Sequence, residues 1–380
     1  MRVRAAASPV LFIVLALAGA GLAWPQAAPG AGGPGEVVVH TALGGFILGY
    51  DVDPGGTEGL LSEALTREDG RHDIAVEAFD QRTGEIVAVL RQEDDSRNGF
   101  ATLGIFGHAG LTEFEHARTL FVDRRRYLLS DPVDANRFTG EWTPPFDGPE
   151  DIIAQAVASP GSGTALFLGF RNTAADFHSY LFTSDVGANT FGPVIRLEDK
   201  VFDWNLSPVA AFDAGAGRAV VGGSFGCYRC PIEIGLVDLA SGAQSRFRGL
   251  GTGFVNGIAV DPRTHVVATT SEDDFSVEFY DLANDTRRRV RLPGATSQAQ
   301  SGGAVAVDAL HGLFLVGQEF SSTAPSGSSI HVFDEHGDLV ESLDGFSLPA
   351  SPATMALDPA RRRGYVIVTP ALTTLQSFTY

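Results

Sequence analysis

Carboxylate side chains are the residues of this chain that are best suited to chemistry. Glu272, Asp273 and Asp274 are consecutive and form its sharpest acidic cluster. Neighbouring like charges raise the pKa of a carboxyl group, so such a cluster can supply a general base or bind a cation. The same three residues are equally typical of a solvated hairpin tip. The sequence therefore leaves both roles open.

Four other oxygen-bearing side chains fall close to the starts of runs that we expect to be innermost strands. Carboxylate and amide oxygens that converge from separate strands would suit Ca²⁺, which takes about six to eight oxygen ligands. Ca²⁺ is the one cofactor that the residues suggest. Because Asn and Asp are also common turn residues, a ring of solvated turns is the alternative. The four residues are Asn98, Asp151, Asn205 and Asn256.

Aromatic residues occur in the same group of predicted loops as the acidic cluster. Together they predict an acidic, aromatic mouth that binds a ligand on one face of the molecule. The histidines show no Ser–His–Asp register, so nucleophilic catalysis has no visible constellation. The aromatic residues are Trp204, Phe225, Tyr228, Phe275 and Phe320.

The elements that must position these side chains are short apolar runs that recur along the chain. Many runs end in Asp before a turn, as in Phe79-Asp80, Val237-Asp238 and Phe333-Asp334. The Asp that ends the third run of each unit recurs at intervals of 43 to 54 residues. Such an interval accommodates four strands with their turns, which is typical of a β-propeller blade.

Counting the units predicts an all-β, seven-bladed β-propeller that forms a single domain over residues 36–380. The last unit has only three runs, and the isolated run at 36–41 precedes the first unit. We expect this N-terminal strand to complete the last blade and cover its edge. Six or eight blades remain alternatives because the first two units are irregular.

The repeat residues resemble those of a known group of propellers. The segments at 256–262 (Asn-Gly-Ile-Ala-Val-Asp-Pro) and 279–285 (Phe-Tyr-Asp-Leu-Ala-Asn-Asp) are similar to the repeats of YVTN/NHL-type and lactonase-like proteins. The resemblance covers most of residues 36–380 and implies a propeller. The group includes protein-binding scaffolds, lactonases and calcium-dependent hydrolases, so the resemblance does not decide between them.

The N-terminus has the features of an export signal. Arg2 and Arg4 precede an apolar run at 10–20, and small residues follow at 21–23. This pattern predicts a signal peptide over 1–23, although an uncleaved anchor is the alternative. Residues 24–35 are rich in Pro, Ala and Gly and predict a flexible linker. We expect an exported protein, periplasmic or secreted, without stable membrane insertion.

Composition narrows the class of partner. The net charge is −19, with 27 Lys and Arg against 46 Asp and Glu. Such a surface repels nucleic acid and anionic membranes. The first functional hypothesis is therefore a scaffold that binds a protein partner or small ligand at the mouth. The second is a lactonase-like, metal-assisted hydrolase of a lactone or ester. The sequence does not indicate the oligomeric state.

The chain has two cysteines, Cys227 and Cys230, which predict a local disulfide in an oxidising compartment. We expect no free thiol and no covalent dimer under non-reducing conditions. Because the closed loop is very short, Cys227→Ser should lower the free energy of unfolding by only about 1–3 kcal/mol. A thiol titration and denaturant unfolding measure these two quantities. Two free thiols in the exported protein would contradict the assignment.

Overall fold

The fold is all-β in the part of the chain that can be described. A computed structural model describes residues 37–53, 55–66, 72–94, 109–113, 118–123, 126–131, 137–142, 151–159, 164–172, 177–185, 190–197, 209–224, 231–253, 255–271, 275–295, 302–318, 328–346, 355–368 and 372–380. Over these ranges the chain forms strands, turns and two short 3-10 segments, η2 (Ala214–Ala216) and η3 (Pro359–Arg361). No helix among them is long and apolar enough to cross a membrane.

The described strands form seven antiparallel sheets, six of four strands and one of five. In most sheets the strands follow one another in chain order, so each is a simple meander. The first three are β2 (Phe46–Val52), β3 (Glu58–Thr66), β4 (His72–Asp80) and β5 (Ile86–Asp94); β6 (Ala109–Glu113), β7 (Arg118–Asp123), β8 (Arg126–Asp131) and β9 (Arg137–Trp142); and β10 (Asp151–Ser159), β11 (Thr164–Asn172), β12 (Phe177–Asp185), β13 (Thr190–Phe191) and β14 (Ile195–Arg196).

The other four sheets follow the same plan, except that the last includes the N-terminal strand. They are β15 (Val209–Asp213), β16 (Arg218–Ser224), β17 (Pro231–Asp238) and β18 (Gln244–Thr252); β19 (Val255–Asp261), β20 (Val266–Ser271), β21 (Ser276–Asp281) and β22 (Thr286–Arg291); β23 (Gly302–Asp308), β24 (Leu313–Gln318), β25 (Ser328–Asp334) and β26 (Leu339–Phe346); and β27 (Met355–Asp358), β28 (Arg363–Val368) and β29 (Thr374–Thr379) with β1 (Val38–His40).

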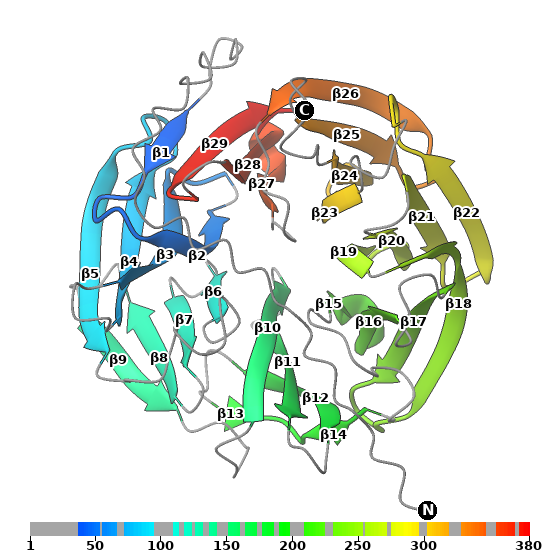
Figure 1. Ribbon diagram of the computed structural model, residues 1–380, viewed down its shortest axis with the longest axis horizontal. Coiled ribbons are helices and arrows are strands. Elements are labelled where there is room, and N and C mark those ends of the chain that lie inside the picture. Colours follow the sequence, from blue (N-terminus) through cyan, green and yellow to red (C-terminus); the bar gives the residue numbers. More distant parts are fainter. Residues whose placement is uncertain are drawn as a thin grey trace, which may run out of the picture.

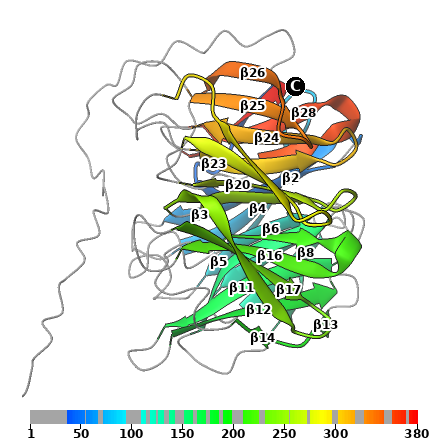
Figure 2. The ribbon, with the colours of Figure 1, turned by 90° about the vertical axis from the view of Figure 1, so that its right-hand side faces the viewer.

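The sheets surround a common centre, with their first strands inside (Figure 1). Their last strands lie outside, except that β1 is the outermost strand of the last sheet. Each first strand contacts the first strand of the next sheet, and β27 contacts β2. Seen from the side, the strands run across the thin dimension of the molecule (Figure 2). This arrangement is compatible with a β-propeller.

The N-terminal strand pairs with the C-terminal one. In the antiparallel ladder of β1 and β29, Val39 lies opposite Leu375. Val37 and Ser377 add two bonds, from the Val37 N–H to Ser377 Oγ at 2.6 Å and from the Ser377 N–H to the Val37 carbonyl at 2.8 Å. The strand expected at 36–41 thus forms the outer strand of the last sheet.

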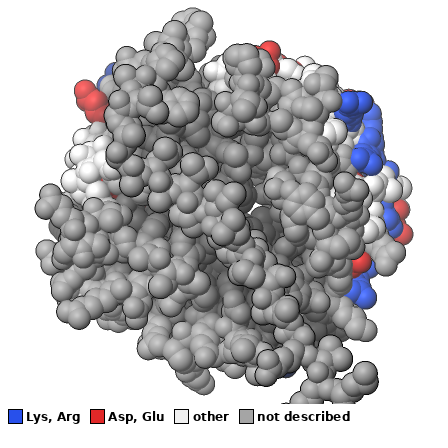
Figure 3. All heavy atoms as spheres, in the orientation of Figure 1, with Lys and Arg blue, Asp and Glu red and all other residues white. Residues whose placement is uncertain are grey.

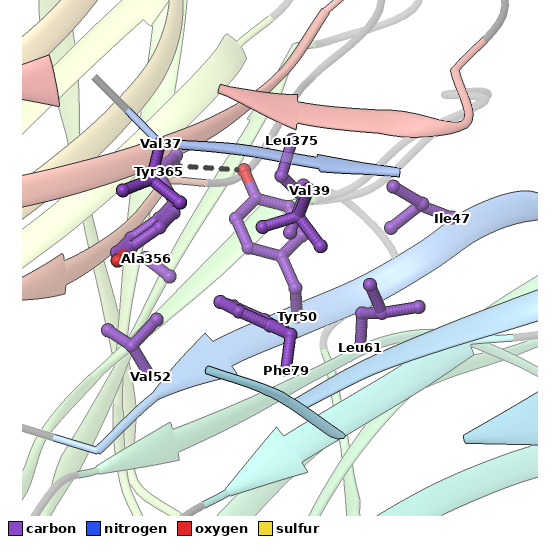
Figure 4. Close-up of a cluster of buried hydrophobic side chains, with 10 residues drawn as sticks. All are labelled: Val37, Val39, Ile47, Tyr50, Val52, Leu61, Phe79, Ala356, Tyr365 and Leu375. Atoms are coloured by element: carbon purple, nitrogen blue, oxygen red, sulfur yellow. Dashed lines mark hydrogen bonds between the residues drawn. The ribbon is translucent and has the colours of Figure 1, made fainter. Parts of the chain in front are cut away.

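One hydrophobic cluster contains side chains from both ends of the chain (Figure 4). Tyr50 donates a hydrogen bond from its hydroxyl to the Tyr365 carbonyl at 3.3 Å. Phe79 and Tyr365 meet edge to face, with ring centroids 5.8 Å apart. Removing these side chains from water stabilises the contact between the last sheet and the first. The cluster comprises Val37, Val39, Ile47, Tyr50, Val52, Leu61, Phe79, Ala356, Tyr365 and Leu375.

Aspartates cap the turns between third and fourth strands, as the sequence predicts. Asp80 Oδ1 accepts the N–H groups of Arg82 at 2.7 Å and Thr83 at 2.9 Å, and these bonds lower the pKa of Asp80. Gly84 follows with a φ of 77°, a conformation that glycine adopts without a steric penalty. The local prediction of an Asp-capped turn is confirmed here.

A second set of aspartates, each fully buried, ends the first strands on the same edge as these turns and joins neighbouring sheets. Asp213 lies 3.0 Å from His265 Nδ1 in the next sheet. Asp308 accepts the Tyr380 hydroxyl at 3.0 Å, and Asp358 accepts the Gly55 N–H at 2.9 Å. Because an unsatisfied buried carboxylate is costly, these bonds fix the contacts between sheets.

Positive side chains gather on one part of the outer rim. Figure 3 shows them along the margin at which Figure 1 places β18 and β22. Arg288 on β22 pairs with Asp338 at 2.7 Å, and Arg287 lies over the Phe247 ring at 5.6 Å from its centroid. These arginines therefore bridge adjacent sheets at the rim.

Neighbouring valines in β1 test the contact between the two ends of the chain. Val39 is fully buried, whereas Val38 is 42% exposed. Val39→Ala should lower the free energy of unfolding by about 1.5–3 kcal/mol, because it removes buried methyl groups and leaves a cavity. Val38→Ala should change it by less than about 0.5 kcal/mol. Denaturant unfolding measures both, and equal effects would contradict the packing of β1.

Candidate functional site

The candidate site lies on the face where first strands begin and second strands end. We call this face the mouth. The first strands of four sheets each shift register near their mouth ends, and such bulges are common beside functional sites. The shifts fall between Ile47 and Gly49, Ile153 and Gln155, Val255 and Gly257, and Gly302 and Val305.

The strands β19 and β23 approach each other closely beside one of these shifts. A Cβ atom on Gly257 would lie 2.4 Å from the Gly303 carbonyl oxygen, so only glycine fits there. Thr270 donates a hydrogen bond from its hydroxyl to the same oxygen at 2.5 Å. The backbone at this part of the mouth is therefore held in a defined position.

Three sheets carry a buried ionisable side chain at one shared position near the mouth. It lies three residues before the Asp that ends the third strand, and its occupants are Glu77, Glu278 and His331. Since buried ionisable groups cost free energy, each needs polar partners.

Glu77 meets a second buried carboxyl group, Glu63. Glu77 lies opposite Leu61, and Glu63 is two residues further along β3, so both side chains share one side of the sheet. Both are fully buried. Burial, followed by the hydrogen bond and the charge of Glu77, raises the pKa of Glu63 to about 8. At neutral pH the pair therefore shares one proton.

Glu278 holds the chain where it leaves one sheet for the next. Its Oε2 accepts the Leu250 N–H at 2.9 Å and also the Tyr280 hydroxyl. Ser271, two residues beyond the position opposite Glu278, donates to the Thr252 carbonyl at 3.0 Å. Both bonds anchor β18 just before the chain enters β19.

His331 forms the third polar group, between Gln318 and Ser342. Its Nε2 lies 2.7 Å from Gln318 Oε1, and its Nδ1 lies 2.9 Å from Ser342 Oγ. Because an amide oxygen only accepts, Nε2 carries the ring proton and Nδ1 accepts from Ser342. Burial lowers the pKa of His331 to about 4, so the ring is neutral at pH 7. Protonating this ring, as general-base catalysis would require, is therefore costly.

Sequence reasoning missed these side chains. The only signal that could have found them is a polar residue within an apolar run, such as His331 in Ser-Ile-His-Val-Phe. Such a signal does not reveal the partner, because Glu63 and Gln318 come from other strands. The register of the sheets brings each pair together.

Three of the predicted site residues fall within the described residues. Phe275 precedes β21, is half-buried and packs against the cluster that contains Phe279. Asn256 is half-buried at the register shift of β19. Asp151 begins β10 opposite Arg171, although its side chain lies outside the description. Asp151 and Asn256 thus both lie at the mouth end of a first strand, and their role in a metal site stays a prediction.

The remaining predicted residues lie outside the described residues, so their roles stay predictions. They are the aromatic residues Trp204, Phe225, Tyr228 and Phe320, the acidic residues Glu272, Asp273 and Asp274, the amides Asn98 and Asn205, and the cysteines Cys227 and Cys230. Within the ranges that the structure describes, no group of three or more His, Cys, Asp or Glu side chains is arranged to hold a metal ion.

Comparisons with known proteins do not supply a family. Neither the family models nor the curated proteins searched contain a match to this chain.

The buried imidazole of His331 predicts a defined dependence of stability on pH. In the unfolded chain, histidine has a pKa near 6.5 and binds a proton below that pH. In the folded protein the His331 ring binds this proton only when the pH falls to about 4. The contribution of His331 to stability is thus present above pH 6.5 and is lost as the pH falls to 4. Over this range the loss is about 3 kcal/mol.

Replacement of His331 should remove that loss. The free energy of unfolding of His331→Gln, measured relative to the wild type, should rise as the pH falls from 6.5 to 4. His336→Gln is the control, because His336 is exposed in the following hairpin. The same change in both variants would contradict the assignment to His331.

Proposed function

We propose that this protein is an exported, seven-bladed β-propeller whose mouth binds a protein partner or a small ligand. In this proposal each sheet is one blade, and β1 completes the last blade. The leader at 1–23 directs export, and the linker at 24–35 joins it to the propeller. Binding is the function, without a covalent step.

The succession of contacts between first strands supports a closed ring of blades. It passes from β2 through each later sheet to β27, which returns to β2. The ladder between β1 and β29 supports the borrowed strand, because it pairs an edge that the last blade would otherwise expose.

The register shifts at the mouth are the observation that carries the proposed binding function. A bulge leaves a residue out of the strand ladder and redirects its backbone and side chain. Four first strands have such a shift near the same face. Together with the aromatic and acidic residues that the sequence predicts for the mouth loops, these shifts favour a surface shaped for recognition.

The second candidate function is a lactonase-like, metal-assisted hydrolase at the same mouth. Asn256, at one of the shifts, is the described residue that favours it, because an amide oxygen there can join a Ca²⁺ site. The sequence predicts Asn98, Asp151 and Asn205 as its companions. The two candidates differ in whether a metal is needed.

A metal and turnover assay separates the two candidates. Under the binding proposal, a chelator leaves the melting temperature unchanged, and a panel of lactones and esters is not hydrolysed. A Ca²⁺ site occupied at a hundredfold excess over its Kd would stabilise the fold by about 2.7 kcal/mol. A chelator-induced fall in melting temperature, with loss of hydrolysis, would establish the hydrolase instead.

A thermal-shift screen with two asparagine variants tests the location of binding. A ligand that stabilises the wild type should stabilise Asn256→Ala much less, because Asn256 lies at a mouth bulge. Asn284→Ala should respond as the wild type does, because Asn284 lies in the Asp281-capped turn on the opposite face. If the stabilisation by a ligand is lost only in Asn284→Ala, the ligand binds away from the mouth.

A further inference from the structure

The connection between β1 and β2 rests directly on the Glu63–Glu77 pair. The Ala42 N–H points at both Glu77 oxygens, at 3.0 and 2.9 Å. The Gly45 N–H donates to Glu63 Oε2 at 2.7 Å. The residues between these donors, Leu43 and Gly44, are exposed. The connection therefore covers two buried carboxyl groups with a single layer of chain.

Few other charges act on this pair among the described side chains. Apart from Glu77, the groups that influence the pKa of Glu63 are the Gly45 N–H and the Thr41 hydroxyl, and both lower it. His40, on β1, points elsewhere, with Nδ1 3.2 Å from Thr374 Oγ1.

Other titratable groups on the surrounding strands lie towards the opposite edge of the first sheet, away from the Glu63–Glu77 pair. Glu58 and Asp80 face each other where β3 begins and β4 ends, and Asp51 lies opposite Leu60 near the end of β2. The side chains at 72–74 and 90–94 lie outside the described residues. Among the described side chains, Glu77 is therefore the group whose charge opposes the ionisation of Glu63.

We propose that the Glu63–Glu77 pair is a proton-operated latch that holds the β1–β2 connection closed over the first sheet and releases it when the shared proton is lost. With one proton, the two carboxyl groups hydrogen-bond to each other while their other oxygens accept the N–H groups of the connection. Without it, two negative charges face each other away from water. Such a pair must be hydrated or separated.

Opening of the connection is the least disruptive route to hydration. On their other sides the carboxyl groups are enclosed by the strands of the first sheet, whereas residues 42–44 are already exposed. Because the connection continues directly from β1, which is only three residues long, its release also loosens the pairing of β1 with β29. The latch thus couples alkaline pH to the contact between the two ends of the chain.

The sign of this coupling follows from the raised pKa of Glu63. The folded state keeps a proton up to about pH 8 that the unfolded chain releases near 4.5. The contribution to stability is therefore fully present below pH 4.5 and is lost as the pH rises through 8. Between pH 4.5 and 8, each pH unit should increase opening by up to about tenfold, and the increase should level off above pH 8.

Hydrogen exchange of the full-length protein between pH 6 and 10 tests the latch. After correction for intrinsic exchange rates, the protection of the Ala42, Gly45 and Val39 amides should fall by about tenfold or more between pH 7 and 9.5. Protection in β20 should stay constant, since that strand is remote from the latch. In Glu63→Gln the protection should be flat, because a neutral amide still accepts from Gly45 and donates to Glu77.

Two more variants make the result decisive. Glu77→Gln removes the opposing charge instead and should reduce the slope of the profile, even where Glu63→Gln fails to fold, while burial alone still raises the pKa of Glu63. Asp80→Asn, a change at the end of the same strand and away from the latch, should retain the wild-type profile. The latch is overturned if wild-type protection does not change with pH, if both glutamine variants keep the wild-type slope, or if β20 loses protection in parallel.

Discussion

The pairing of β1 with β29 is the contact on which the rest of the arrangement depends. Three residues from the start of the chain form the outer strand of a sheet that otherwise comes from its end. The ladder itself is short, so its stability comes mainly from the cluster beneath it. Val39 and Leu375 pack there with Tyr50 and Phe79 of the first sheet. Hydrophobic burial thus joins parts of the chain that the sequence separates by more than 300 residues.

The two faces of the molecule use buried polar groups differently. On the edge opposite the mouth, Asp213, Asp308 and Asp358 each end a first strand and bond to the neighbouring sheet. The same residue type recurs there because it performs the same structural task in these three sheets. Near the mouth, by contrast, a shared position carries Glu77, Glu278 or His331, each with different partners. Uniform bonding fixes the frame, while the face proposed to bind a ligand varies from sheet to sheet.

Burial gives two of these groups opposite responses to pH. It disfavours the charged form of either group, which raises the pKa of Glu63 and lowers that of His331. Between about pH 4.5 and 6.5 the two contributions to stability therefore change in opposite directions and partly cancel. Above this range, of these two groups only the Glu63–Glu77 pair still changes its contribution to stability with pH. This pair lies where the N-terminal strand joins the first sheet.

Local features of the structure could be read from the sequence. Apolar runs that end in Asp became strands, and Asp80 caps its own turn because its carboxylate reaches the N–H groups two and three residues ahead. These contacts depend on neighbours in the chain, so residue order alone specifies them. The buried partners do not follow from residue order. Glu63 meets Glu77, and Gln318 meets His331, only because the strand register sets them on one side of a sheet. Likewise, the isolated N-terminal run predicted a borrowed strand, but only the tertiary structure determined that its connection lies over two carboxyl groups, where burial makes them share a proton.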